Sequence, residues 1–138
     1  MASHDFFVMI KPDGVRRGLV GEILSRFEKR NFGVKAMKML QPSDDTTRFI
    51  EKHYESHAGM HYYEDTIKFM TTGPIVILKL YGSIQVARSI VGPTVPWEAF
   101  PGSVRGDYTC SFPENLIHCS HSPGDATKEL GVWSVKLD

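Results

Sequence analysis

The stretch Ile75-Val76-Ile77-Leu78-Lys79-Leu80 is the clearest strand signal in this chain, and it follows the breaker Thr72-Gly73-Pro74. A second apolar run, Phe6-Phe7-Val8-Met9-Ile10, ends at Lys11-Pro12-Asp13-Gly14. Short apolar and β-prone runs with breakers beside them predict buried strands. The other elements are predicted outward from these two strands.

An amphipathic helix is predicted after the first strand. Apolar residues recur at helical spacing from Leu19 to Phe27, with charged residues between them, and Asn31-Phe32-Gly33 ends the pattern. Residues 34–40 are predicted to form another strand. These three elements give a strand–helix–strand order in the first 40 residues.

Two further helices are predicted before the strand at 75–80. Ser43 or Asp44 is a suitable N-cap for the first, which is expected to continue to about residue 57. Ala58-Gly59 interrupts it, and a second short helix is expected over residues 61–70.

The last third of the chain contains a long loop between two capped helices. Ser83 can cap a helix over residues 84–91, and Ser122-Pro123-Gly124-Asp125 is a strong start for the last one. Residues 92–113 contain three glycines and four prolines, which predicts a long and functional loop. Residues 116–119 are predicted to be a short strand.

The element order predicts the fold class. Without the extra helices and the long loop, the order is β-α-β-β-α-β, which is typical of the ferredoxin-like sandwich, an α+β fold. It has a four-stranded antiparallel sheet with helices on one face, and we expect the final helix or a second subunit to cover the other face. The length of 138 residues suggests one domain over residues 1–138.

Composition excludes several classes of protein. The chain has 16 basic and 16 acidic side chains and no long run of like charge, so neither nucleic acid nor a membrane surface is expected as a partner. No apolar run is long enough to span a bilayer, and no signal peptide is evident. Two cysteines without metal or disulfide spacing fit a reducing compartment, so the cytoplasm is the expected location.

His118 is the best candidate nucleophile, because it ends a short strand just before a strongly capped helix. N–H groups in the first turn of a helix favour anions, so a histidine there can meet a phosphoryl group. Ser120 and Glu129 are near enough in sequence to orient its ring. On this local pattern alone, a buried structural histidine is an equally good interpretation.

Five cationic residues are candidates for holding phosphate: Lys11, Arg16, Arg17, Arg88 and Arg105. Phosphoryl transfer needs such groups because charge spreads over the peripheral oxygens in the transition state. Neither a P-loop nor a G-x-G-x-x-G motif is present, so side chains from several elements would have to converge. Taken singly, each cation is more simply a solvated surface charge.

Two other groups of residues are alternative candidates for a functional site. His53, His57 and His61 have the spacing of one helix face, as in a metal site, but Gly59 interrupts that helix and polar surface is the simpler interpretation. Cys119 lies beside His118, yet neighbours on a strand point to opposite faces, so a small buried side chain is the simpler interpretation.

Three motifs in register resemble one family over nearly the whole chain. Asn115-Leu116-Ile117-His118-Cys119-Ser120-His121-Ser122 resembles the signature N-x-x-H-x-S-D-S of the nucleoside diphosphate kinases. Ile10-Lys11-Pro12-Asp13-Gly14-Val15 is similar to the family's first-strand motif. Pro101-Gly102-Ser103-Val104-Arg105-Gly106-Asp107-Tyr108 is similar to its P-G-[ST]-[IV]-R-G-D-[FY] motif.

The resemblance implies a ping-pong transfer of the γ-phosphoryl group from a nucleoside triphosphate to a nucleoside diphosphate through a phosphohistidine at His118. Ser120 and Glu129 would orient that ring, and Tyr62 would lie against the base. Magnesium (Mg2+) would arrive on the nucleotide phosphates, without a dedicated protein site. The residues implied to hold phosphates or ribose are Lys11, Tyr54, Arg88, Thr94, Arg105 and Asn115.

The chain also departs from the family pattern. His121 replaces the usual aspartate, Cys119 stands where glycine is common, and Pro93 follows Gly92 where an acidic residue is frequent. A homo-oligomer is implied, with a hexamer expected ahead of a tetramer, although the short tail after Trp133 leaves both open. The alternative function is a non-catalytic nucleotide-binding or regulatory protein of the same fold.

Overall fold

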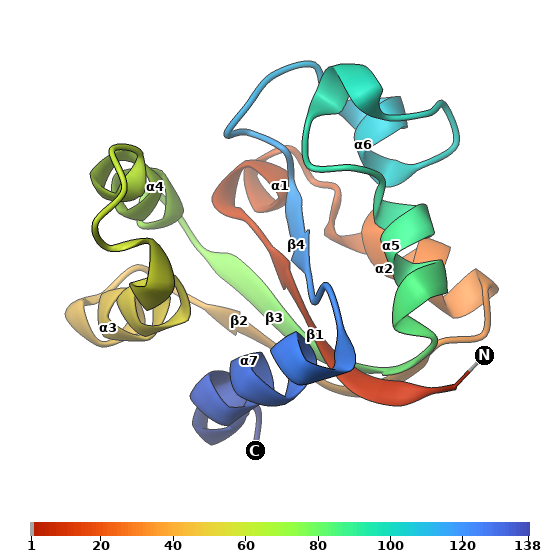
Figure 1. Ribbon diagram of the computed structural model, residues 1–138, viewed down its shortest axis with the longest axis horizontal. Helices are drawn as coiled ribbons and strands as arrows, with labels where there is room; N and C mark the ends of the chain where they lie inside the picture. Colours follow the sequence, from red (N-terminus) through yellow and green to blue (C-terminus); the bar gives the residue numbers. More distant parts are fainter. Residues whose placement is uncertain (1) are drawn as a thin grey trace.

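A four-stranded antiparallel sheet forms the centre of the computed structural model, which describes residues 2–138 (Figure 1). Its strands follow the order β2-β3-β1-β4. The strands are β1 (His4–Ile10), β2 (Gly33–Leu40), β3 (Ile75–Gly82) and β4 (Ile117–Cys119). This arrangement confirms the ferredoxin-like fold predicted from the element order.

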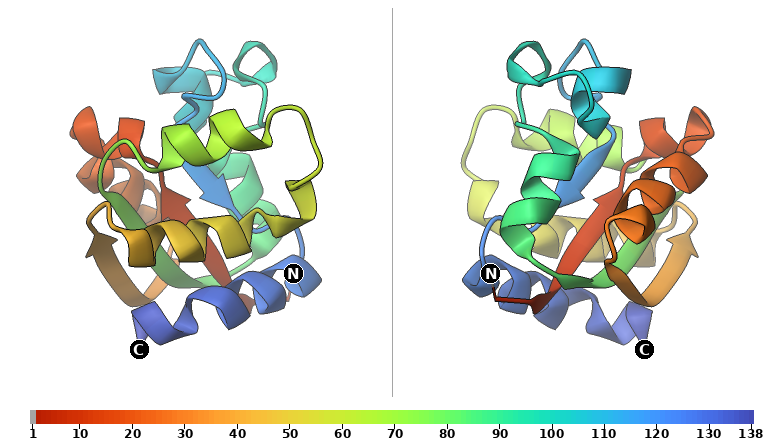
Figure 2. Two further views of the ribbon diagram at one scale, coloured as in Figure 1. Left: turned by 90° about the vertical axis from the view of Figure 1, so that its left-hand side faces the viewer. Right: turned by 90° about the vertical axis from the view of Figure 1, so that its right-hand side faces the viewer.

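Helices cover both faces of the sheet (Figure 2). They are α1 (Pro12–Arg16), α2 (Val20–Lys29), α3 (Asp44–His53), α4 (Tyr63–Met70), α5 (Ile84–Val91), α6 (Val104–Tyr108) and α7 (Pro123–Leu137), with short 3-10 turns η1 (Glu55–His57) and η2 (Pro96–Glu98). Helices α2 and α5 pack on one face, and α3, α4 and α7 pack on the other. Within residues 2–138, no helix has the length and apolar character needed to cross a membrane.

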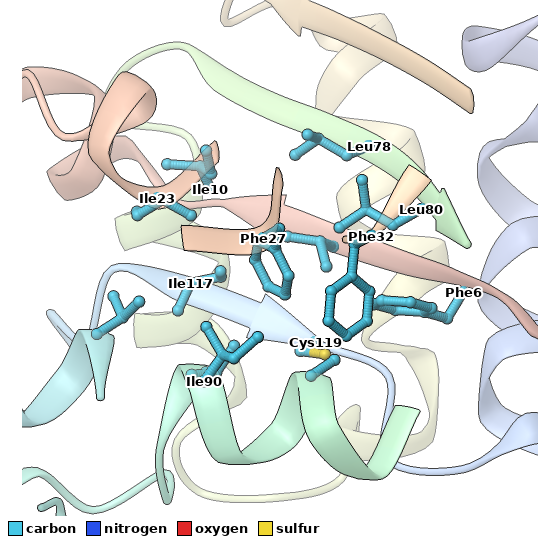
Figure 3. Close-up of a cluster of buried hydrophobic side chains, with 14 of the residues drawn as sticks. Phe6, Ile10, Ile23, Phe27, Phe32, Leu78, Leu80, Ile90, Ile117 and Cys119 are labelled. Carbon is cyan, nitrogen blue, oxygen red and sulfur yellow. The ribbon is translucent and has the colours of Figure 1, made fainter. Parts of the chain in front are cut away.

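Strand β1 is buried from both sides, and this explains its uninterrupted apolar sequence. Phe6, Val8 and Ile10 pack against the α2 and α5 side, whose aromatic centre is drawn in Figure 3. Phe7 and Met9 point the other way, into a cluster that contains Trp133 of α7. These five side chains, from Phe6 to Ile10, have no exposed surface, as the period of two along a strand allows when both faces are covered.

Serine caps set the starts of three helices, as their sequences predict. The hydroxyl oxygens of Ser43, Ser83 and Ser122 accept hydrogen bonds from backbone N–H groups in the first turns of α3, α5 and α7. In contrast, the helix expected to run to about residue 57 ends at His53. Its continuation is the tighter turn η1, in which His57 N–H donates to the carbonyl of Tyr54.

The segment predicted as a turn after β1 is the start of helix α1. Pro12 takes the first helical position, where its missing N–H costs nothing. Gly14 is required here, because a Cβ on it would lie 2.8 Å from the Cγ2 atom of Ile10 and 3.1 Å from the carbonyl oxygen of Leu116. This close approach brings the end of β1 next to the segment that leads into β4.

The long segment at 92–113 is ordered by its own short elements and by contacts with α2. Ser103 caps α6 through a 3.0 Å hydrogen bond from the N–H of Gly106. Arg26 of α2 donates to the carbonyl of Gly102 at 2.8 Å and to the carboxylate of Asp107 at 2.7 Å. The expected loop therefore contains η2 and α6, and α6 carries Arg105 toward β4.

Candidate active site

A cavity of about 420 Å³ opens between β4, α3, α4 and α7, within the size range of small-molecule sites. Nine of the ten candidate site residues line it: Lys11, Tyr54, Tyr62, Arg88, Thr94, Arg105, Asn115, His118 and Glu129. Ser120, the tenth, is fully buried behind the cavity wall. Residues from distant parts of the sequence thus converge on one cavity.

His118 and Cys119 point to opposite faces of β4, as predicted. Strand β4 pairs with β1, so that His118 lies opposite Met9 and Cys119 opposite Val8. Cys119 is fully buried in the α2 and α5 cluster, and burial raises the pKa of its thiol to about 12. A thiol in that state is no nucleophile, which confirms the structural interpretation of Cys119.

A chain of hydrogen bonds fixes the ring of His118. Its Nε2 lies 2.7 Å from Oε2 of Glu129, and Oε1 of Glu129 accepts a 2.6 Å hydrogen bond from the hydroxyl of Ser120. The Ser120 hydroxyl in turn accepts from the backbone N–H of Phe7 at 3.0 Å. Glu129 therefore orients His118 directly, and Ser120 does so only through Glu129.

The same contacts assign the proton on the imidazole. A carboxylate accepts hydrogen bonds, so a neutral His118 donates from Nε2 to Glu129, and its Nδ1 keeps the lone pair. Burial, together with the nearby charges of Lys11 and His121, holds the pKa of His118 well below its usual value. The ring thus stays neutral, and nucleophilic at Nδ1, well into the acidic range.

Asn115 clamps two other candidate residues in place. Its Oδ1 accepts a 2.8 Å hydrogen bond from Nζ of Lys11, and its Nδ2 donates to the carbonyl of Thr94 at 3.0 Å. Asn115 is almost fully buried, so these contacts hold the ammonium group of Lys11 at the cavity wall. Burial, followed by repulsion from Arg105, lowers the pKa of Lys11 to about 8.

Arg105 is anchored by backbone carbonyls. Its Nε donates to the carbonyl of Asn115 at 3.2 Å and its Nη1 to that of Gly92 at 2.9 Å, while its Nη2 donates to that of Ile117. A guanidinium has five N–H groups, so one on each terminal nitrogen is left for a ligand. Burial and the neighbouring Arg88 lower the pKa of Arg105 to about 10, and Arg88 itself donates to the carbonyl of Cys119 at 3.2 Å.

Arg16, Arg17 and the N-terminal end of α7 contribute less positive charge to the cavity than the sequence suggested. Arg16 donates to the hydroxyl of Thr72 and Arg17 to the carbonyl of Tyr108, and neither lines the cavity. At the start of α7, Pro123 has no N–H and the N–H of Asp125 donates to the Ser122 hydroxyl. The positive side of the site is therefore made by Lys11, Arg88 and Arg105 more than by the helix end.

Aromatic side chains also line the cavity. Tyr62 and Phe112 both line it, and the Tyr62 hydroxyl forms a hydrogen bond with Nδ1 of His57. Phe112 was missed at the sequence level, because nothing in a long loop indicates which aromatic residue turns toward the site. Lys128 was missed as well, although its spacing of three residues from Asp125, which also lines the cavity, places the two on the same face of α7.

The three-histidine metal site does not form. Among the described residues, the one group with metal-ligand character is His53, His118 and Glu129, whose candidate ligand atoms lie within 4.8 Å of one another. Nδ1 of His53 accepts a 3.0 Å hydrogen bond from Nε1 of Trp133, so the proton of a neutral His53 occupies Nε2 and leaves it no lone pair for a metal. This group fits a hydrogen-bonded assembly better than a metal centre.

The lining also bears on magnesium. Only Asp125 and Glu129 bring carboxylates to the cavity, and Glu129 is bound to His118 and Ser120. Mg²⁺ prefers a near-octahedral set of oxygen ligands and keeps several waters. Such a lining fits an ion carried chiefly by a ligand's phosphates, rather than one held by an all-protein cage.

Comparisons with known proteins identify the family of this chain. Residues 5–136 match the family model described as nucleoside diphosphate kinase. The chain is 46% identical to a nucleoside diphosphate kinase of Saccharolobus solfataricus, over 100% of this chain and 99% of that protein.

Solved structures give the same result. A halophilic nucleoside diphosphate kinase from Halobacterium salinarum, solved in complex with CDP, superimposes with a TM-score of 0.88 at 30% identity, covering 96% of this chain and 88% of that one. A nucleoside diphosphate kinase family protein from Babesia bovis gives 0.88 at 34% identity, covering 100% and 93%. With a full-length sequence match and the same fold, this chain belongs to the nucleoside diphosphate kinase family.

Proposed function

We propose that this phosphotransferase works through a covalent phosphohistidine on Nδ1 of His118. The observation that carries the proposal is the 2.7 Å contact between Nε2 of His118 and Glu129, which leaves Nδ1 as the nucleophile. In the first half-reaction Nδ1 bonds to the γ-phosphorus of a nucleoside triphosphate as the bond to the β–γ bridging oxygen breaks, and the diphosphate leaves. In the second, the terminal oxygen of another diphosphate takes the phosphoryl group, and the lone pair returns to Nδ1.

The cations stabilise the charge that moves during transfer. Lys11, Arg88 and Arg105 are held at the cavity wall by protein contacts before substrate arrives, so little reorganisation is needed as charge develops on the peripheral oxygens. Glu129 stabilises the positive charge that the imidazole gains when Nδ1 bonds to phosphorus. Ser120 keeps the Glu129 carboxylate aimed at the ring.

The substrates are nucleoside di- and triphosphates. Tyr62 and Phe112 offer π-faces to the base, and stacking tolerates every base, which suits an enzyme with several substrates. Tyr54, Thr94 and Asn115 line the same cavity and would contact the sugar and phosphates. The Halobacterium salinarum relative solved with CDP supports this substrate class.

Magnesium completes the site as part of the substrate. Bound to the nucleotide phosphates, Mg²⁺ supplies charge neutralisation, with Asp125 as the one cavity carboxylate free to contact its hydration shell. The protein's own contribution is the three cations and the oriented imidazole.

The remaining expectations concern the whole molecule. We infer a single catalytic domain over residues 1–138 that acts in the cytoplasm as a homo-oligomer. A hexamer is expected ahead of a tetramer, and light scattering on the purified protein distinguishes the two by mass. The non-catalytic alternative is less well supported, because nucleotide binding alone needs no half-buried imidazole oriented by a carboxylate beside the phosphates.

Incubation with γ-labelled ATP tests the phosphohistidine. Label should transfer to the wild-type protein, survive alkali and be lost in acid, and subsequent ADP should remove it. The His118→Ala variant should take up no label, whereas a His61→Ala variant, which changes an exposed histidine outside the cavity, should label like wild type. Undiminished labelling of His118→Ala would overturn the assignment.

The pH dependence of kcat/KM should reflect Lys11. Its ammonium has a pKa lowered to about 8, so its charge is present below that pH and is lost as pH rises through it. The kcat/KM for nucleotide should therefore fall above about pH 8. Because the pKa of His118 is depressed, no matching loss should appear near pH 6.5.

A Lys11→Arg variant provides the control for this profile. Arginine keeps its charge across the tested range, so its kcat/KM, whatever its absolute value, should lack the alkaline decline. The same decline in Lys11→Arg and wild type would assign it to another group.

Removing Arg105 should slow phosphoryl transfer strongly. Loss of one preorganised donor commonly costs about 10²- to 10³-fold in rate, and Arg105→Ala should show a loss of that order in single-turnover labelling. Arg105 also bonds three carbonyls, so ADP affinity and thermal melting should be measured in parallel to separate misfolding from lost catalysis. Near wild-type turnover would remove Arg105 from the site.

A further inference from the structure

His53 lies against the nucleophile, although its sequence pattern connects it only with a metal site. It is the last residue of α3 and lines the cavity. Its ring is perpendicular to that of His118, with ring centroids 4.7 Å apart. One of its nitrogens lies within 4.8 Å of the ligand-capable atoms of His118 and Glu129.

Trp133 determines where His53 carries its proton. The indole N–H can only donate, and it donates to Nδ1 of His53 at 3.0 Å, so that nitrogen must present its lone pair. Trp133 is fully buried and stacks on Phe7 at an interplanar angle of 9°, which keeps the donor in place. A neutral His53 is thereby restricted to the tautomer with its proton on Nε2.

The Nε2–H group lies on the edge of the His53 ring that is not bonded to Trp133. Nδ1 and Nε2 lie on different edges of an imidazole, and the Nδ1 edge is turned toward Trp133, which does not line the cavity, whereas His53 does. Among the described residues, the hydrogen bond from Trp133 is the only one made by the ring of His53. The Nε2–H donor therefore has no protein acceptor among these residues and belongs to a side chain of the cavity lining.

His53 is also held in its neutral state. Burial, followed by repulsion from His118, lowers its pKa to about 3. Glu129 opposes this shift with a smaller effect, and the charges of Lys11 and His57 lower the pKa by still smaller amounts. The ring therefore remains a neutral donor at neutral pH. A neutral donor can approach His118 without repelling the positive charge that its imidazole gains during transfer.

We propose that His53 is a further phosphate-binding residue of this enzyme, donating its Nε2–H to a non-bridging oxygen of the phosphoryl group while that group is transferred to and carried by His118. The inference rests on the proposed phosphohistidine at His118. During the proposed transfer, the phosphoryl oxygens are the hydrogen-bond acceptors that come next to His118. The Nε2–H group of His53, whose tautomer is already fixed, is a donor on the neighbouring ring. Trp133 acts as a positioning residue, because it works through His53.

Two substitutions of His53 test the roles of Nδ1 and Nε2 separately. The side-chain amide of glutamine can place an N–H near the position of Nε2, whereas that of asparagine reaches only the position of Nδ1, where it can still accept from Trp133. In single-turnover labelling by γ-labelled ATP, His53→Asn should be slower by about 10- to 100-fold, the usual effect of losing a hydrogen bond to a charged group. His53→Gln should recover most of that rate.

ADP binding and thermal melting are the structural controls. ADP lacks the γ-phosphoryl group, so its affinity should be nearly unchanged in both variants, and His4→Asn, remote from the cavity on β1, should match wild type throughout. A His53→Asn enzyme that labels at the wild-type rate would overturn the proposal. Equal losses of rate and ADP affinity in both variants would also overturn it, because they would show a purely structural role.

The tautomer can be observed directly. ¹⁵N NMR of histidine-labelled protein should show His53 protonated at Nε2, and a Trp133→Phe variant, which removes the indole N–H, should show both tautomers and slower labelling. A wild-type His53 protonated at Nδ1 would contradict the inference. Absence of label on the wild-type protein would instead remove the phosphohistidine itself, so the two failures are distinguishable.

Discussion

The hydroxyl of Ser120 joins three elements of the fold beside His118. It accepts a hydrogen bond from the backbone N–H of Phe7 in β1 and donates one to Glu129 of α7 at 2.6 Å. Ser120 itself is the residue directly after β4. A hydroxyl with no exposed surface needs such partners, since an unpaired buried polar group is costly. The position of Glu129, and with it the orientation of His118, therefore depends on the register between β1 and β4 and on the docking of α7.

The face to which each β4 side chain points was predictable, because it follows from the local sequence. The period of two along β4 places Cys119 in the core and His118 on the opposite face, and the apolar run of β1 requires cover on both faces. The serine caps of α3, α5 and α7 follow from the same short-range chemistry. The fold class could accordingly be predicted from the element order. Nine of the ten candidate site residues line the cavity, and their roles were expected from the family resemblance.

The contacts that depend on distant residues were not predictable in this way. Asn115 binds Lys11 across 104 positions, and Trp133 binds His53 across 80. Sequence spacing linked His53 to His57 and His61, but the helix ends at His53 and its ring turns toward Trp133 instead. Phe112 and α6 likewise lie in a segment whose conformation is set by Arg26 of α2, which no local pattern indicates.

The cavity holds several cations close enough to repel one another. Burial and repulsion from neighbouring cations lower the pKa of Lys11 to about 8 and that of Arg105 to about 10. Keeping both side chains charged in the folded protein therefore costs free energy. Carbonyl groups and the Asn115 side chain hold these cations in place nonetheless. A nucleotide phosphate would relieve the repulsion, and a transition state that spreads charge over more oxygens would relieve it further. In the proposed mechanism, geometry fixed by folding would therefore stabilise the transition state more than the ground state, which is the requirement for catalysis.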